Sequence, residues 1–389
     1  MSNIKKYKMK LEVLTPLHIG GADYKSKLDK KEYVFDKDKK TLTLIDNEKF
    51  VGFLIKKNLF EKYIAYIENN VNAKVMVQNR NINLLSFLKA NNIDKDIQDF
   101  RKKAPIKLDM NIEKMNDIKL MLRDVQGKLY IPGTSIKGAL INLLLVDYII
   151  KNREEFLKEK RIILSECKKA NDDRSIRSLK NDIKKIVNQI EKSIIYGNNK
   201  DLEKSKRFGI SVSDSYSYSN TRTNFYQDTD EKRTTKIGED KTKSMPVARE
   251  YIMANSIFDF DITLDIDLLK ESKLKIKNID DLIASIENAM FYLIEVLEDK
   301  NSPRTENLVL GANTGFLQKT IVYALFEDKE ERLEVIKKML HKGSKNAIGN
   351  HLNDKFSPRV LNRIKINGKN QLAGLVKIMK VDEKNVGTN

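Results

Sequence analysis

Cysteine and histidine are scarce in this chain of 389 residues, and their scarcity excludes several kinds of site. The single cysteine, Cys167, cannot form a disulfide within the chain or supply a CxxC metal-binding pair. The three histidines, His18, His341 and His351, lack the spacings typical of a zinc site. We therefore expect no disulfide framework, no metal centre and no cofactor.

Long hydrophobic segments are also missing. The longest apolar stretch, Ala139 to Ile150, is interrupted by Asn142 and Asp147. It is shorter than the roughly 20 residues that a transmembrane helix needs. The first residues, MSNIKKYKMKLEV, lack the apolar centre of a secretion signal. These features predict a soluble, cytoplasmic protein that has no membrane partner.

Common catalytic motifs are absent from the sequence. It contains no GxSxG, no HExxH, no Walker loop and no paired Cys/His nucleophile. Asp124 and Asp214 lie near strand ends and loops, where isolated aspartates are usually caps or turn formers rather than metal ligands. We accordingly name no catalytic or metal-binding residue.

Positive charge is abundant. Lys and Arg total 73 against 55 Asp and Glu, which gives a net charge of +18. Such an excess suits a polyanionic partner, either nucleic acid or an acidic membrane surface. Because the chain is also rich in Lys, Asn and Ile throughout, many of these lysines must be ordinary solvated surface residues.

Strands are predicted from alternating apolar and polar residues. Residues 8–15 place Met9, Leu11 and Val13 on one face, as a half-buried strand does. Two short runs separated by KDKK, at 32–36 and 41–46, are typical of a hairpin. Further strands are expected at 128–131, 208–216, 257–264, 359–367 and 372–381.

Helices are predicted in two long insertions and beside the strands. Residues 46–116, which begin with the cap residue Asp46, form a mostly helical insertion. Apolar residues recur every three or four positions in 151–206, which predicts a long amphipathic helix or a helical hairpin. Another helix is expected at 280–298. Residues 213–246 contain almost no aliphatic side chains and are predicted to be an exposed or partner-ordered loop.

This order of elements predicts an α+β fold rather than a doubly wound sheet. We divide the chain into a core at 1–266, with helical insertions at about 46–116 and 151–206, and a C-terminal α+β part at 267–389 that carries a glycine-rich turn.

The turn at 131–139, IPGTSIKGA, is the strongest local feature. A helix is expected to open there at Thr134 or Ser135. The unpaired N–H groups of a helix N-terminus attract phosphate, and Ser135 and Lys137 would add a hydrogen bond and a charge. An ordinary Thr or Ser cap explains the same pattern, and on the pattern alone that second interpretation is favoured.

Two other glycine turns also follow strands. His18 lies in LHIGG (17–21), where it could contact nucleic acid, although a packed, hydrogen-bonded histidine is favoured between two apolar neighbours. GANTGF (311–316), with Lys319 after it, could meet phosphate or could be a tight strand-to-helix connection. The predicted loop at 213–246 mixes aromatic residues with cations, which suits contact with bases and phosphates. A plain flexible loop explains the same composition and is slightly favoured on the sequence alone.

Taken in order, three segments resemble the RAMP protein family: LEVLTPLHIGG (11–21), YIPGTSIKGALINLLL (130–145) and LVLGANTGFLQKTI (308–321). MPVAREYI (245–252), followed by strands, is similar to the capping subunit of type III-A CRISPR (Csm) complexes. The resemblance spans most of the chain, but the helical insertions carry no matching motif.

The resemblance implies a ferredoxin-like (RRM-like) core and a non-enzymatic, RNA-binding structural subunit. Such a subunit caps the 3′ side of the crRNA, beside the RAMP backbone subunit and other Csm complex subunits, and contributes to crRNA maturation in antiviral defence. Recruitment of host nucleases fits the same role. The resemblance also makes the phosphate-binding interpretation of the turns the favoured one. The predicted RNA-binding residues are His18, Gly20, Gly21, Gly133, Thr134, Ser135, Lys137, Arg222, Arg233, Arg249, Gly311, Asn313, Gly315 and Lys319.

An alternative function is a metal-independent crRNA-processing endoribonuclease of the RAMP superfamily. In that case His18 would act as a general acid or base, and Lys137 would stabilise the charged transition state. Cleavage of repeat RNA in EDTA that disappears in a His18→Ala variant would favour this alternative.

Overall fold

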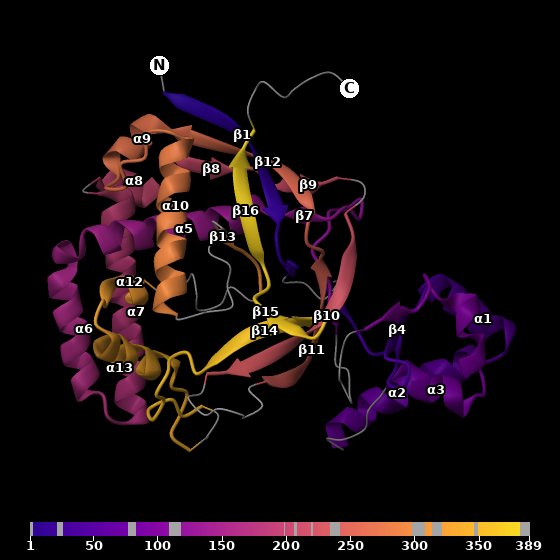
Figure 1. Ribbon diagram of the computed structural model, residues 1–389. Coiled ribbons are helices and arrows are strands. Elements are labelled where there is room, and N and C mark those ends of the chain that lie inside the picture. Colours follow the sequence, from indigo (N-terminus) through magenta and orange to yellow (C-terminus); the bar gives the residue numbers. More distant parts are fainter. Residues whose placement is uncertain are drawn as a thin grey trace, which may run out of the picture.

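Two lobes make up the described part of the chain (Figure 1), a main body with two β-sheets and a smaller lobe of helices. The mixed content of helices and strands confirms the predicted α+β class. The computed structural model describes residues 3–21, 26–76, 83–108, 118–197, 199–205, 208–218, 221–233, 242–297, 308–312, 321–345 and 349–381.

The larger sheet is built around strand β1, which pairs antiparallel with both β12 and β16. Met9 lies opposite Phe260 and Leu11 opposite Phe258, so the predicted apolar face of β1 is in the core. The strand order is β13-β16-β1-β12-β9-β7, and β8 also pairs with β12. The strands are β1 (Ile4–Val13), β7 (Tyr130–Ile131), β8 (Ile210–Val212), β9 (Ser215–Ser217), β12 (Ile257–Asp265), β13 (Leu308–Val309) and β16 (Leu375–Lys380).

Strands from both predicted parts of the chain meet in this sheet, because β13 and β16 lie beyond residue 267 and β16 pairs with β1. Helices α5 (Gly133–Lys151) and α10 (Ile279–Val296) pack against each other and against the sheet's apolar face. By length and composition alone α5 could cross a membrane. However, its apolar side chains, such as Leu140, Leu143 and Leu144, are buried in the core.

The predicted helical stretch at 151–206 is confirmed as a helical hairpin. Asp172 caps its second helix by accepting hydrogen bonds from the backbone N–H groups of Arg174 and Ser175. The apolar residues that suggested the helix, such as Ile176 and Ile183, are buried. The helices on this side are η3 (Arg153–Phe156), α6 (Leu157–Lys169), α7 (Asp173–Tyr196), α8 (Lys200–Ser205), α9 (Ile266–Glu271), α12 (Val322–Leu325) and α13 (Lys329–Leu340).

The second sheet of the main body corrects the prediction of a loop at 213–246. Within the described residues, β10 lies in this range and pairs antiparallel with β11, which begins in it. Buried aromatic and paired polar side chains, including Phe225, Tyr226 and Asp228, replace the aliphatic residues that a strand usually shows. The order is β15-β14-β10-β11-β6-β2, with strands β2 (Lys27–Leu28), β6 (Ile118–Lys119), β10 (Thr223–Lys232), β11 (Thr242–Ile252), β14 (Val360–Ile366) and β15 (Lys369–Gln371).

The small lobe contains the predicted hairpin and the predicted helical insertion, as far as it is described. Asp46 caps its first helix by accepting a hydrogen bond from the Lys49 N–H, as the sequence predicted. The lobe has its own apolar core, around Phe50, Phe87 and Phe100. Its elements are β3 (Tyr33–Asp36), β4 (Thr41–Leu44), α1 (Asn47–Lys56), α2 (Phe60–Met76), α3 (Leu84–Ala90), η2 (Asp94–Asp96), α4 (Ile97–Phe100) and β5 (Ile106–Lys107).

Candidate nucleic-acid interface

A cleft of about 520 Å³ brings the described parts of all three predicted glycine turns together. The turn after β1 contributes residues 18–21, the start of α5 contributes Thr134, Ser135 and Gly138, and the end of β13 contributes Gly311. Lys27, Lys119 and Arg249, from three strands of the second sheet, also line it. Asn313, Gly315 and Lys319, which the sequence also placed here, lie outside the described residues.

The three cations form a row across neighbouring strands. Lys27 on β2 is the register partner of Lys119 on β6, and Lys119 is the partner of Arg249 on β11. Side chains in such positions lie on one face of a sheet, about 5 Å apart at Cβ, where like charges destabilise each other. The Arg249 guanidinium is accordingly the largest cause of the lowered pKa of Lys119, followed by burial of the lysine.

One carboxylate, that of Asp228, forms an ion pair with a cation of this row. Arg249 donates from Nε to Oδ2 of Asp228 over 2.8 Å, and the Tyr251 hydroxyl donates to the other oxygen over 2.9 Å. Lys27 and Lys119 make no ion pair or side-chain hydrogen bond with another described residue. A phosphate in the cleft would therefore relieve a repulsion that the protein leaves largely uncompensated.

The start of α5 differs from the expected Thr or Ser cap. The helix begins at Gly133, and neither Thr134 nor Ser135 caps it. Instead the Gly133 N–H donates to Oδ1 of Asp214 over 2.7 Å, so the expected Thr or Ser cap is wrong. This carboxylate occupies part of the helix end that was expected to attract phosphate.

The glycines at this helix have different roles. A Cβ on Gly133 would lie 2.3 Å from the carbonyl oxygen of Val212, so glycine is required for α5 to pack against β8. A Cβ on Gly138 would meet no atom within 4 Å. Gly138 is exposed at the cleft, and its missing side chain keeps that part of the cleft open.

His18 is held firmly in the wall of the cleft. Its ring is 2% exposed, and Nδ1 lies 2.7 Å from the carbonyl oxygen of Glu250. Because a carbonyl oxygen can only accept, Nδ1 carries the proton of this hydrogen bond. Burial, opposed by this bond and reinforced by Arg249 and Lys119, lowers the pKa of His18 to about 4. The predicted packed histidine is confirmed, and the ring is neutral at pH 7.

A partly buried ion pair anchors β11, the strand whose Glu250 carbonyl binds His18. Arg123 donates from both terminal nitrogens to Glu250, over 2.8 and 2.6 Å. Glu250 also accepts from the Thr223 hydroxyl and the Met121 N–H. Burial favours a raised pKa for Glu250, but these hydrogen bonds and the Arg123 charge together hold it below its ordinary value. The carboxylate is therefore charged and satisfied.

The third turn packs on the first. The Ala312 N–H donates to the His18 carbonyl over 2.9 Å. Gly311 has φ +86°, and a Cβ there would lie 2.2 Å from the same carbonyl oxygen. Backbone geometry and close approach thus both require glycine at 311.

Three predicted contact residues lie elsewhere. Lys137 is half-buried, burial lowers its pKa, and it does not line the cleft. Arg222 is exposed just before β10. Arg233 follows the other end of that strand, where its guanidinium lies 5.3 Å from the ring centre of Phe356. These positions separate Arg222 from Arg233 by the full length of β10.

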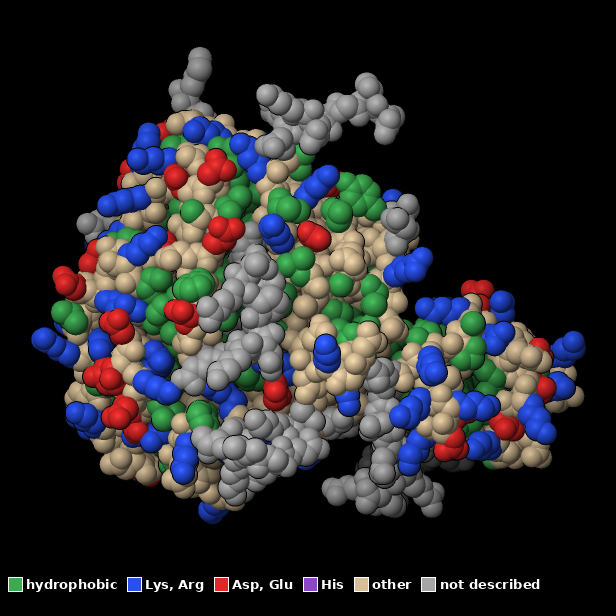
Figure 2. Space-filling model, in the orientation of Figure 1, with side chains coloured by type: hydrophobic (Ala, Val, Ile, Leu, Met, Phe, Trp, Pro, Cys, Tyr) green, Lys and Arg blue, Asp and Glu red, His purple; other side chains and the backbone are tan. Residues whose placement is uncertain are grey.

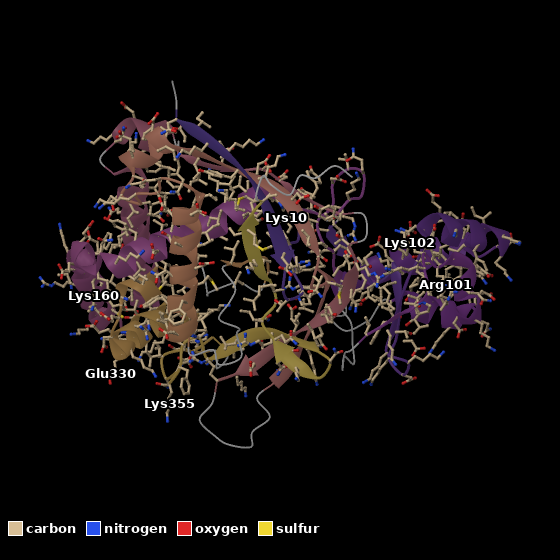
Figure 3. All side chains as sticks on the ribbon, turned by 45° about the horizontal axis from the view of Figure 1, so that its top comes forward. Lys10, Arg101, Lys102, Lys160, Glu330 and Lys355 are labelled. Carbon is tan, nitrogen blue, oxygen red and sulfur yellow. The ribbon has the colours of Figure 1, made fainter. Side chains whose placement is uncertain are left out.

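Positive charge extends beyond the cleft. Figure 2 shows Lys and Arg side chains over both lobes. Arg101 and Lys102 lie on the helical lobe in Figure 3, well apart from Lys160 and Lys355 on the main body. Net charge alone therefore does not locate the binding site.

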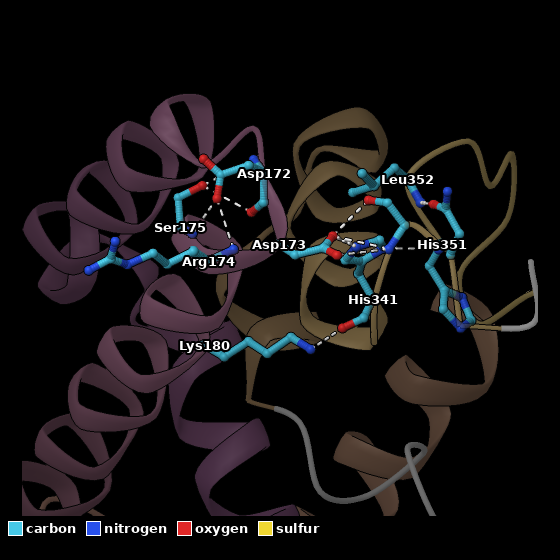
Figure 4. Close-up of polar contacts among 10 residues, drawn as sticks. Asp172, Asp173, Arg174, Ser175, Lys180, His341, His351 and Leu352 are labelled. Carbon is cyan, nitrogen blue, oxygen red and sulfur yellow. Dashed lines mark hydrogen bonds and ion pairs between the residues drawn. The ribbon is translucent and has the colours of Figure 1, made fainter. Parts of the chain in front are cut away.

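The other two histidines are paired with carboxylates at the C-terminal side of α13. Nε2 of His341 lies 2.9 Å from Asp173, which also accepts hydrogen bonds from Ser344, as Figure 4 shows in part. His351 lies 2.7 Å from Asp354. Within the described residues, no group of three or more His, Cys, Asp or Glu side chains could hold a metal ion.

Comparison with known proteins gives one family match. The sequence profile of the RAMP superfamily matches residues 10–372 of this chain. A protein of Streptococcus thermophilus named CRISPR system Cms protein Csm5 is 26% identical over 330 residues, which cover 82% of this chain and 81% of that protein. A protein of the same name from Enterococcus italicus is 32% identical over 160 residues. That match covers 36% of this chain and only 43% of the relative.

Two solved structures have a similar fold. A chain of the cryo-EM structure of a type III-A Csm–crRNA–target RNA ternary complex superposes with a TM-score of 0.61 at 17% identity, over 96% of this chain and all of that one. The crystal structure of Csm5 from T. onnurineus gives a TM-score of 0.50 at 18% identity, over 81% of this chain and 93% of that one.

Proposed function

We propose that this chain, which belongs to the RAMP superfamily, is an RNA-binding structural subunit of a type III-A CRISPR (Csm) effector complex. In this role it caps the 3′ side of the crRNA beside the RAMP backbone subunit and contributes to crRNA maturation in antiviral defence. The names of the two relatives and the fold shared with a chain of the crRNA-bound complex support the assignment.

One observation carries the RNA-binding part of the proposal. The cleft sets Lys27, Lys119 and Arg249 side by side with one bound carboxylate, and two of the three have no acidic partner among the described residues. Asp228 offsets only part of the repulsion on Lys119, so such a row costs stability in the free protein and is compensated when phosphates bind. Because the contacts are to phosphate, binding should depend strongly on salt and weakly on guide sequence.

The arrangement of the larger sheet supports a ferredoxin-like core. The strand order β16-β1-β12-β9 is antiparallel at each pairing. Along the chain, α5 lies between β1 and β9, and α10 lies between β12 and β16, which is the βαββαβ order of that core. The helical lobe and the α6–α7 hairpin are then insertions into it.

We propose a binding role and no catalytic one. Nδ1 of His18 is committed to the Glu250 carbonyl, and the low pKa of the ring makes it a weak base. The endoribonuclease alternative requires Lys137 beside His18, yet Lys137 does not line the cleft with it. No feature of the described residues favours that alternative.

The proposal is tested by purifying the tagged full chain with the subunits encoded beside it and extracting the bound RNA. A Lys27→Gln/Lys119→Gln variant removes two cleft cations, and Lys158→Gln/Lys168→Gln removes two exposed cations of α6 as a matched control. We expect crRNA to co-purify with the wild type and with the control, and ultraviolet crosslinking to join this chain to the 3′ part of that crRNA. The cleft variant should give much less of this crosslinked RNA. A wild-type assembly without RNA would overturn the proposal.

A further inference from the structure

His18 offers the cleft a hydrogen-bond acceptor. Since Nδ1 carries the proton that is donated to Glu250, the other ring nitrogen, Nε2, has a free lone pair. Nε2 has no hydrogen-bond partner among the described residues. It lies beside Gly20, and both residues line the cleft. The tilted ring of Tyr251, 5.6 Å away between ring centres, packs against the imidazole and helps to fix its orientation.

The cations around this acceptor can only donate. Lys27, Lys119 and Arg249 supply N–H groups, which match the oxygens of a phosphate. An acceptor beside them needs a ligand group that donates. In a nucleic-acid backbone, phosphates and ring oxygens accept, and the ribose 2′-hydroxyl is the group that donates. DNA lacks this hydroxyl.

We propose that Nε2 of His18 accepts a hydrogen bond from a ribose 2′-hydroxyl of the bound strand and thereby makes the cleft selective for RNA over DNA. This inference rests on the proposed function, because it assumes that the cationic cleft holds a sugar–phosphate backbone. It assigns His18 a specificity role that needs neither proton transfer nor cleavage.

The structure also gives Gly20 a reason to be glycine. A Cβ at this position would lie 3.0 Å from Nε2 and 3.7 Å from the neighbouring ring carbon. A methyl group there would press on the acceptor and cover it, while leaving the charge of the cleft unchanged. Gly20→Ala therefore blocks access to Nε2 with a single added carbon atom. The backbone of Gly20 does not have a positive φ, so alanine fits it without strain.

Two further variants separate the loss of the Nε2 acceptor from the general effect of an added methyl group. His18→Asn places its amide nitrogen two bonds from Cβ, as Nδ1 is, so it keeps a donor for the Glu250 carbonyl and removes Nε2. Gly52→Ala adds a methyl group to open space on α1, outside the cleft, and serves as the matched control for Gly20→Ala. Thermal unfolding checks that each variant is folded.

The experiment measures the affinity of the full chain for three single strands of one sequence. These are RNA, DNA and RNA in which fluorine replaces every 2′-hydroxyl. The fluorinated strand keeps the RNA sugar pucker but cannot donate. We expect the wild type to bind RNA about 2- to 10-fold more tightly than the fluorinated strand, the ratio that one neutral hydrogen bond supplies. Gly20→Ala and His18→Asn should lose this ratio, and Gly52→Ala should keep it.

The outcomes distinguish the two levels of the proposal. Equal wild-type affinity for RNA and the fluorinated strand overturns the inference and leaves the cationic cleft intact. Loss of affinity for all three strands alike in Gly20→Ala and His18→Asn shows that the turn is only structural, which also overturns it. Failure of the wild type to bind any strand overturns the proposed function itself. Cleavage of RNA in EDTA that His18→Asn abolishes would replace the binding role with a catalytic one.

Discussion

The buried, neutral His18 should make the protein less stable in mild acid. The pKa of its imidazole falls from the ordinary 6.5 to about 4 on folding. Between these values the unfolded chain binds the proton more readily, so the free energy of unfolding decreases as pH falls through this window. With these two pKa values, His18 alone removes about 2 kcal/mol between roughly pH 7.5 and pH 5.

The assay is urea unfolding at both pH values for the wild type and His18→Asn. All other groups are the same in the two proteins, so their contributions cancel in the difference. The wild type should lose about 2 kcal/mol more than the variant on acidification. Equal losses would refute the reasoning, because they would mean that His18 titrates with similar pKa values in the folded and unfolded chain.

The remaining stability predictions concern the anchors of the cleft. Glu250→Gln should destabilise the fold by roughly 2–3 kcal/mol in urea at neutral pH, because it leaves the half-buried Arg123 charge without its partner; a loss below about 0.5 kcal/mol would contradict this. Gly133→Ala should cost about 1–3 kcal/mol through its clash with Val212, whereas Gly138→Ala should add roughly 0.5–1 kcal/mol of helix stability. Thermal melts that rank these two variants in the opposite order would show that α5 is packed differently.

The sequence predicted elements well where a periodic pattern reflects burial. The alternation in β1 and the three-to-four spacing in α7 both correspond to buried faces. The pattern failed in β10, because that strand buries Phe225 and Tyr226 together with the paired carboxylate Asp228 instead of aliphatic side chains. Composition alone could not distinguish such a strand from a polar loop.

The candidate site was predictable in its turns and in one of its cations, Arg249, but not in the other two. Gly20, Ser135 and Gly311 do meet in one cleft, as motifs far apart in sequence suggested. Lys27 and Lys119 were missed because they lie on two-residue strands that leave no periodic signal. Only the pairing of β2, β6 and β11 puts these cations in one row, and pairing between distant strands is not visible in a single sequence.

The most direct test of the cationic cleft is the salt dependence of RNA affinity. For single strands the slope of log affinity against log salt changes by about 0.7 for each phosphate contact, so Lys27→Gln/Lys119→Gln should reduce its magnitude by roughly 1.4. The Lys158→Gln/Lys168→Gln control should leave the slope at the wild-type value. A cleft variant with an unchanged slope would show that these lysines do not touch the phosphates, and would contradict the account.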